Sequence, residues 1–121
     1  MKTEESLGGE IRTVYKTPQF EEFYNSLPIK VQAKFKYVID VIVTVYDVST
    51  KFVKHLQDTD LYEMRVSVGN NEYRTILFAI DKANVIEATK IILLNGFLKK
   101  SSKDYRKQIE IAQTILKDLE R

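Results

Sequence analysis

The segment LYEMRVSVGNNEYRTILFAI, residues 61–80, carries the strongest structural signal in this chain: apolar and polar side chains alternate over residues 61–68, and Gly69-Asn70 separates them from a second, more apolar run over residues 73–80. Alternation with a period of two is typical of a half-buried β-strand. Glycine at the first central position of a two-residue loop favours a type II′ turn. The segment therefore predicts a β-hairpin with strands over residues 61–68 and 73–80.

The two-residue loop determines which side chains face each other in this hairpin. Counting back from the turn places Arg65 directly opposite Arg74 on the same face. Like charges in opposite positions destabilise a sheet by on the order of 0.2–1 kcal/mol, which suggests an anion close by. In one interpretation the arginines grip a phosphate, because the planar guanidinium fork fits its oxygens. In the other, Glu63 and Glu72 on the same face neutralise them as structural ion pairs.

A helical hairpin is expected on the N-terminal side of these strands. Thr17 suits the cap of a helix that begins at Pro18, since its hydroxyl accepts from a free N–H and proline fits the first turn. Ser26-Leu27-Pro28 ends that helix, because the residue before proline is pushed away from helical angles. A second helix is predicted over about residues 28–45, with an apolar face formed by Val31, Phe35, Val38, Ile39, Ile42 and Tyr46.

Further strands and a last helix complete the predicted order. Residues 11–15 form a short strand, and residues 85–94 form the third strand of a meander, which Asn95-Gly96 ends or bends. Residues 102–104 cap a final helix whose apolar stripe comprises Tyr105, Ile109, Ala112, Leu116 and Leu119. Strand, two helices, three-stranded meander and helix together predict an α+β fold with a mainly antiparallel sheet.

Composition narrows the class of protein. A length of 121 residues favours one domain, here expected over residues 11–121 after a flexible tail over residues 1–10. There is no cysteine and His55 is the sole histidine, which excludes disulfides, cysteine nucleophiles and multi-histidine metal sites. Residues 1–10 lack the apolar run of a signal peptide, and the most apolar segment, residues 38–45, is too short to cross a bilayer. We expect a soluble, cytoplasmic protein without a membrane partner.

Positive charge is concentrated in the second half of the chain. Residues 49–107 hold eleven Lys/Arg against seven Asp/Glu, whereas the remainder holds eight against ten. This distribution favours an anionic partner. A basic strip at the start of the last helix comprises Lys99, Lys100, Lys103, Arg106 and Lys107. Cations oppose the dipole at a helix N-terminus, so the strip either faces a polyanion such as RNA or is a solvated face.

Lys54-His55 falls in the loop expected before residue 61. Lys54 is a candidate phosphate ligand or proton carrier, and the imidazole of His55 is a candidate for acid–base work. The alternative for both residues is plain solvent exposure.

Three motifs follow one another in this sequence: LYEMR at residues 61–65, YRTILF at 73–78 and LLNGFLKK at 93–100, before a lysine-rich helix. In this order they resemble the RelE/ParE toxin superfamily, above all its HigB-like, phage-derived branch, whose pattern runs roughly LYELR, YR-hydrophobic, LLHGFxKK. The resemblance spans about residues 10–118. It implies two N-terminal helices packed on a small, mainly antiparallel sheet, with a C-terminal helix.

The resemblance also implies a function: the toxin of a type II toxin–antitoxin system, neutralised by a cognate antitoxin of the helix-turn-helix class. RelE- and HigB-like members are endoribonucleases (mRNA interferases) that cut mRNA in the ribosomal A site, whereas ParE-like members inhibit DNA gyrase. Cleavage uses no metal or cofactor; the ribose 2′-hydroxyl attacks the adjacent phosphate. That reaction needs a proton acceptor, stabilisation of the phosphoryl charge and a proton donor.

Matched position by position, Arg65 and Arg74 correspond to the family's strand arginines, which stabilise the phosphate. Lys54 corresponds to a basic residue before the LYELR strand, and Lys99 to the lysine after the third strand, which contacts RNA or phosphate. Asn95 stands where the HigB-like pattern has histidine. Asparagine does not shuttle a proton at neutral pH, although it hydrogen-bonds to phosphates and bases.

Three functions are therefore open. The first is a ribosome-dependent endoribonuclease in which Lys54, Lys99 or Tyr105 moves the proton. The second is a ParE-like gyrase inhibitor, and the third is a catalytically inactive RelE-fold interaction protein. Both arginines and the basic strip favour the first function, and Asn95 counts against it.

Overall fold

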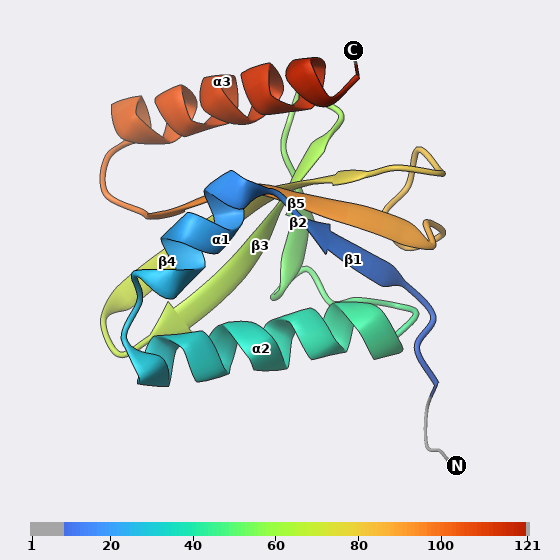
Figure 1. The fold of residues 1–121 in the computed structure, drawn as a ribbon, viewed down its shortest axis with the longest axis horizontal. Coiled ribbons are helices and arrows are strands. Elements are labelled where there is room, and N and C mark those ends of the chain that lie inside the picture. Colours follow the sequence, from blue (N-terminus) through green and yellow to red (C-terminus); the bar gives the residue numbers. More distant parts are fainter. Residues whose placement is uncertain (1–8, 121) are drawn as a thin grey trace.

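The computed structural model describes residues 9–120, so residues 1–8 of the expected tail lie outside the described chain. Figure 1 shows a sheet with helices on both sides. The elements are β1 (Thr13–Lys16), α1 (Pro18–Asn25), α2 (Ile29–Thr44), β2 (Val53–His55), β3 (Leu61–Val68), β4 (Asn71–Ala79), β5 (Lys90–Leu98) and α3 (Ser102–Leu119).

The sheet has the strand order β1-β5-β4-β3-β2. β1 is parallel to β5, and the other pairs are antiparallel. α1 and α2 pack on one face, here called the α2 face, and α3 packs on the other, the α3 face (Figure 1). The predicted α+β class, with two N-terminal helices on a mainly antiparallel sheet and a C-terminal helix, is confirmed.

The larger core lies between the sheet and the helices α1 and α2. Alternate residues of the strands point into it, as the period of two predicts. Its most buried members are Phe20, Phe35, Val38, Ile42, Met64, Val66, Leu77, Ile91 and Leu93. Rings of the two helices cluster within it, with Phe35 in edge contact with both Phe23 and Tyr73.

The smaller core lies between the sheet and α3 and comprises Leu56, Leu61, Ile76, Leu94, Phe97, Ala112 and Ile115. Tyr105, Ile109 and Leu116 pack against it, in agreement with the predicted stripe. Leu119 was wrongly included, because it lies at the end of the helix and is 51% exposed. Ile115 was missed, although it is buried.

The helix caps follow the local sequence. The Thr17 hydroxyl accepts a hydrogen bond from the Phe20 N–H, as predicted, and donates to the carbonyl of Leu94. The cap of α3 is Ser101, one residue earlier than expected, and it accepts from the Asp104 N–H.

Two strand predictions were wrong. Residues 53–55, expected as a loop, form β2 because they pair with Met64, Glu63 and Tyr62 of β3. β5 begins at Lys90 rather than at residue 85, and it continues through Asn95-Gly96 to Leu98. The Asp81 carboxylate accepts hydrogen bonds from the Thr89 and Lys90 N–H groups and so holds the preceding residues in a loop. The register between β4 and β5 shifts between Ile76 and Leu77, which leaves Leu94, just before Asn95-Gly96, without a partner on β4.

Arg12, which the sequence analysis did not single out, joins three parts of the fold. Its side chain is 3% exposed and donates hydrogen bonds to the carbonyls of Ile42, Val45, Tyr46, Val85, Ile86 and Ala88. No carboxylate among the described residues forms an ion pair with it, and burial lowers the pKa of Arg12. Arg12 thus satisfies carbonyls at the end of α2 and in the loop before β5, where the backbone has no partner of its own.

Candidate functional site

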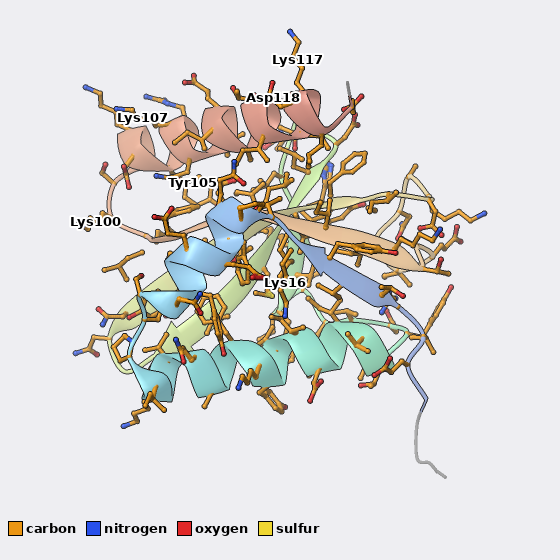
Figure 2. All side chains as sticks on the ribbon, in the orientation of Figure 1. Lys16, Lys100, Tyr105, Lys107, Lys117 and Asp118 are labelled. Atoms are coloured by element: carbon orange, nitrogen blue, oxygen red, sulfur yellow. The ribbon has the colours of Figure 1, made fainter. Side chains whose placement is uncertain are left out.

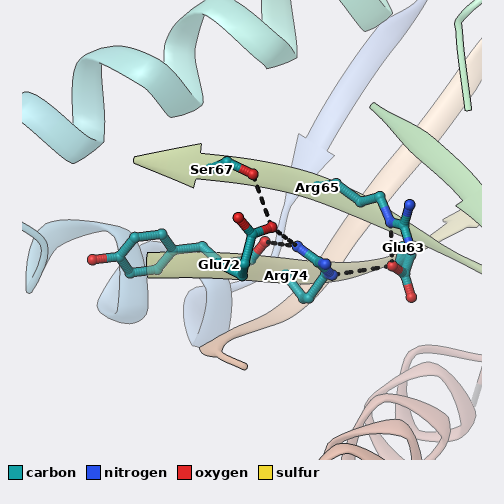
Figure 3. Close-up of polar contacts among 6 residues, drawn as sticks. Glu63, Arg65, Ser67, Glu72 and Arg74 are labelled. Carbon is teal, nitrogen blue, oxygen red and sulfur yellow. Dashed lines mark hydrogen bonds and ion pairs between the residues drawn. The ribbon is translucent and has the colours of Figure 1, made fainter. Parts of the chain in front are cut away.

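The arginine pair lies on the α3 face of the central hairpin. Val68 pairs with Asn71 and Arg65 pairs with Arg74, as the two-residue loop predicted. Gly69 has a positive φ of +60° and Asn70 does not have a positive φ. A type II′ turn requires this combination, because only its first central residue has a positive φ. Figure 3 shows the arginines with Glu63 and Glu72, which contact them, and with Ser67, which contacts Glu72.

Arg74 is held on two sides and is only 5% exposed. Its Nη1 donates to the Tyr73 carbonyl at 3.0 Å and to Glu72 Oε1 at 3.2 Å. Its Nε lies 3.1 Å from Glu63 Oε2, an ion pair without the alignment of a hydrogen bond. Arg74 is therefore committed to contacts within the protein.

Arg65 differs from its neighbour in exposure. Its Nε donates to Glu63 Oε2 at 2.7 Å, and its side chain remains 32% exposed. Among residues 9–120, neither terminal amino group of Arg65 has a hydrogen-bond partner. The bond to Glu63 fixes the direction of the guanidinium, and the two amino groups are free to donate to an anion (Figure 3).

The carboxylates between the arginines relieve their repulsion. Glu63, which is 4% exposed, contacts both guanidinium groups, and Glu72 contacts only Arg74. A hydrogen bond from Ser67 lowers the pKa of Glu72, and Arg74 and Lys99 lower it further. The ion-pair interpretation therefore describes Arg74, while the geometry leaves Arg65 available to bind phosphate.

Lys54 belongs to the same face, although it lies on β2 rather than in a loop. It pairs with Glu63 across the strands, so its exposed side chain lies beside the arginine pair. His55 alternates to the other face, where its ring meets Tyr62 and its Nε2 lies 2.7 Å from the Thr59 carbonyl. His55 is thus separated from the arginines.

Asn95 does not reach the surface beside the arginines. It lies on β5 under α3 and is 6% exposed. Its Nδ2 donates to the Gln108 carbonyl at 3.2 Å and to the Gln108 Oε1 at 3.1 Å, and its Oδ1 is buried without a partner. In this arrangement the amide of Asn95 joins β5 to α3.

The basic strip begins beside Glu72 and follows α3. The Lys99 N–H donates to the Glu72 carbonyl at 2.8 Å, and the Lys99 Nζ lies 5.9 Å from the centroid of the Tyr105 ring. Residues 99–102, Tyr105 and Arg106 line a shallow depression of about 400 Å³. Lys100, Lys103, Arg106 and Lys107 are exposed, and Figure 2 shows Lys100, Tyr105 and Lys107 around the first turns of α3.

The structure therefore brings Arg65, Arg74, Lys54 and Lys99 to one face and leaves Asn95 beneath the helix. Sequence reasoning missed the contact of Ser67 with Glu72; alternation places Ser67 on the same face, which was the available signal. No cluster of three or more metal-ligating side chains occurs within residues 9–120, and no helix there has the length and apolar character needed to span a bilayer.

Comparison with known proteins places this geometry in context. The sequence model of the family described as "Phage derived protein Gp49-like" matches residues 22–117. The comparison with curated proteins found no match. Among solved structures, an E. coli toxin RelE mutant in the free state, with two arginines replaced by alanine, is similar with a TM-score of 0.59 and 13% identity. That match covers 83% of this chain and 96% of the RelE mutant chain.

A second structure, the isolated E. coli RelE toxin, has 12% identity and a TM-score of 0.49, covering 82% of this chain and 96% of that one. Because the first match is only 13% identical in sequence, its structural similarity shows a shared fold. The chain has the RelE fold.

Proposed function

This chain belongs to the Gp49-like family of phage derived proteins, and from that premise we propose that it is the toxin of a type II toxin–antitoxin pair that cleaves mRNA on the ribosome. The RelE fold supports the proposal, since the RelE structure with the same fold is that of a toxin. The motifs at residues 61–65, 73–78 and 93–100 support the HigB-like branch in particular.

The observation that carries the proposal is the state of Arg65. Glu63 orients its guanidinium, and its two terminal amino groups have no hydrogen-bond partner among the described residues. Two parallel N–H donors on a rigid fork match two oxygens of a phosphodiester. Lys54 and Lys99 lie on the same face. The site would therefore surround a bound phosphodiester with positive charge as negative charge develops on its oxygens during cleavage.

The proposed reaction is attack of a ribose 2′-oxygen on the adjacent phosphorus with departure of the 5′-oxygen. Arg65 would stabilise the extra charge on the phosphoryl oxygens, as donors placed before the reaction do. Lys54 or Lys99 would contact the phosphate, and one of Lys54, Lys99 and Tyr105 would transfer the proton. Asn95 has no part in proton transfer in this scheme, because its amide is bound to Gln108 beneath α3.

Lys100, Lys103, Arg106 and Lys107 would bind RNA beyond the cleaved bond, since these cations are exposed next to Lys99. Arg74 would act indirectly, by holding Glu63 and Glu72 in place. The partner that restrains the toxin would be an antitoxin of the helix-turn-helix class, and the place of action would be the cytoplasm.

Induced expression tests this function. Wild-type protein should arrest growth, and Arg65→Ala should relieve the arrest while the folded protein accumulates. Mapping of transcript ends after induction should show new ends within coding regions for the wild type but not for Arg65→Ala. Lys82→Ala is the control, since Lys82 is an exposed cation in the turn between β4 and β5.

Full toxicity of Arg65→Ala would contradict the phosphate-binding role. Growth arrest with DNA damage signalling and intact transcripts would instead identify a gyrase inhibitor. A wild-type protein that neither arrests growth nor cuts transcripts would indicate the inactive interaction protein.

A further inference from the structure

A second aromatic and basic surface lies on the opposite side of the sheet from α3. On α2, the ring of Tyr37 is 55% exposed and the Nζ of Lys34 lies 5.5 Å from its centroid. Lys30 and Lys34 precede Tyr37 by seven and three residues, so all three lie on one face of the helix. An exposed ring between cations on a helix surface is not needed for the core.

The segment before β2 extends this surface. The ring of Phe52 lies 6.2 Å from that of Tyr37 at an angle of 72°, and the Lys51 Nζ lies 5.6 Å from the Phe52 centroid. We call Lys30, Lys34, Tyr37, Lys51 and Phe52 the α2 strip. It combines two neighbouring rings with three ammonium groups.

The α2 strip is continuous with the candidate site. The Arg65 N–H donates to the Phe52 carbonyl at 2.8 Å, which makes these two residues cross-strand neighbours. The regular pairing of β2 with β3 ends at Val53 and Met64. Beyond that pair β3 is the edge of the sheet, so an extended chain bound at Arg65 can pass round the edge to Phe52 and Tyr37.

These features match single-stranded nucleic acid better than other anions. Bases of a single strand stack on aromatic side chains, while nearby cations follow the phosphates. A double helix keeps its bases stacked on each other and would leave both rings unused. An acidic peptide would use the three lysines but would not explain two rings with a cation beside each.

We propose that the α2 strip binds the nucleotides next to the phosphate held at Arg65 in single-stranded RNA, with bases stacked on Phe52 and Tyr37 and phosphates bound by Lys51 and Lys34. This inference rests on the proposed function, since Arg65 is the point from which the RNA would extend.

Binding of a non-cleavable oligonucleotide tests the inference without any need for catalysis. The purified full chain is titrated into a fluorescein-labelled, eight-nucleotide 2′-O-methyl RNA, and anisotropy is measured at several salt concentrations. Tyr37→Ala should weaken binding between about 5-fold and 140-fold, the loss of one stacked base. Phe52→Leu should act in the same direction while it preserves apolar volume in the core.

The lysines should affect the salt dependence. Lys34→Gln together with Lys51→Gln should reduce the slope of log K against log salt by about 1.4, since each phosphate contact to a single strand contributes about 0.7. Tyr15→Ala and Lys36→Gln are matched controls: Tyr15 is exposed on β1 at the opposite edge, and Lys36 is exposed on another face of α2. Both should bind RNA as the wild type does.

Several outcomes would overturn the inference: no binding by the wild type, or unchanged affinity of Tyr37→Ala, or an unchanged salt slope in the double lysine variant. Loss of antitoxin binding in Tyr37→Ala with unchanged RNA binding would assign the strip to a protein partner and also overturn it. Arg65→Ala separates the two proposals. If it stays fully toxic while Tyr37→Ala weakens RNA binding, the phosphate-binding role of Arg65 fails and the α2 strip stands as an RNA-binding surface.

Discussion

The substitution Glu63→Gln tests how the arginine pair is tolerated in the sheet. Glu63 is 4% exposed, and its Oε2 contacts Arg65 at 2.7 Å and Arg74 at 3.1 Å. Glutamine keeps the shape of the side chain and one acceptor oxygen but removes the negative charge. Arg74 would then be left with Glu72, whose side chain is 45% exposed and well solvated.

The expected loss follows from these contacts. Hydrogen bonds to charged groups contribute about 1.5–3 kcal/mol each, and removal of one partner from a buried ion pair costs about 3–5 kcal/mol. Because glutamine retains a neutral hydrogen bond of about 1 kcal/mol, Glu63→Gln should lower the free energy of unfolding by about 2–4 kcal/mol. Glu63→Ala should fall in the full range of about 3–5 kcal/mol.

Urea unfolding, followed by circular dichroism, measures this difference as a shift of the midpoint at constant slope. Glu72→Gln is the matched control, because its partly exposed ion pair contributes about 1 kcal/mol or less. If Glu63→Gln unfolds within about 0.5 kcal/mol of the wild type, the carboxylate does not compensate the arginines, and the reasoning is refuted.

Three further predictions concern the rest of the fold. Arg12→Lys should lower the free energy of unfolding by about 2–4 kcal/mol in the same urea assay, because an ammonium group has three N–H donors for six carbonyls; an unchanged midpoint would contradict this role. Hydrogen bonds from Thr89 lower the pKa of Asp81 from 3.8 to about 2, so the stability that Asp81 contributes is complete above pH of about 4 and is lost as the pH falls towards about 2. Asp81→Asn should remove that part of the acid dependence of the melting temperature. If the melting temperatures of the variant and the wild type fall in parallel between pH of about 4 and about 2, this prediction is contradicted. A methyl group at Gly96 would overlap the ring of Phe23, so Gly96→Ala should cost about 1–3 kcal/mol in thermal unfolding, and adding Phe23→Leu should restore part of the loss.

Features set by neighbours in the sequence were predicted well. The register of Arg65 with Arg74 depends on the two-residue turn and on strand alternation, both of which are local. The start of α1 depends on Thr17 and Pro18 and was also correct. By contrast, β2 has three residues, too few for a period to be recognised, and it exists because β3 offers a partner.

The candidate site shows the same division between local and distant effects. Alternation placed Glu63, Arg65 and Arg74 on one face. It could not show that Arg74 is buried and Arg65 partly exposed, since that depends on how α3 and the neighbouring strands cover them. The burial of Asn95 likewise depends on Gln108 of α3, thirteen residues away. Arg12 had no recognisable pattern, because its partners are carbonyls of two segments that are distant from it in the sequence.

The strand order has a consequence for the synthesis of the chain. β1 is synthesised before the other strands, yet its neighbour in the sheet is β5, the last strand. Thr13 therefore cannot pair with Lys90 until β5 has been synthesised. Until β5 emerges, β1 lacks its partner and β4 lacks one of its two neighbours. Contacts between such distant residues slow folding. A nascent chain cut short before residue 90 therefore has no route to the complete sheet, and the native sheet forms only after β5 has been synthesised.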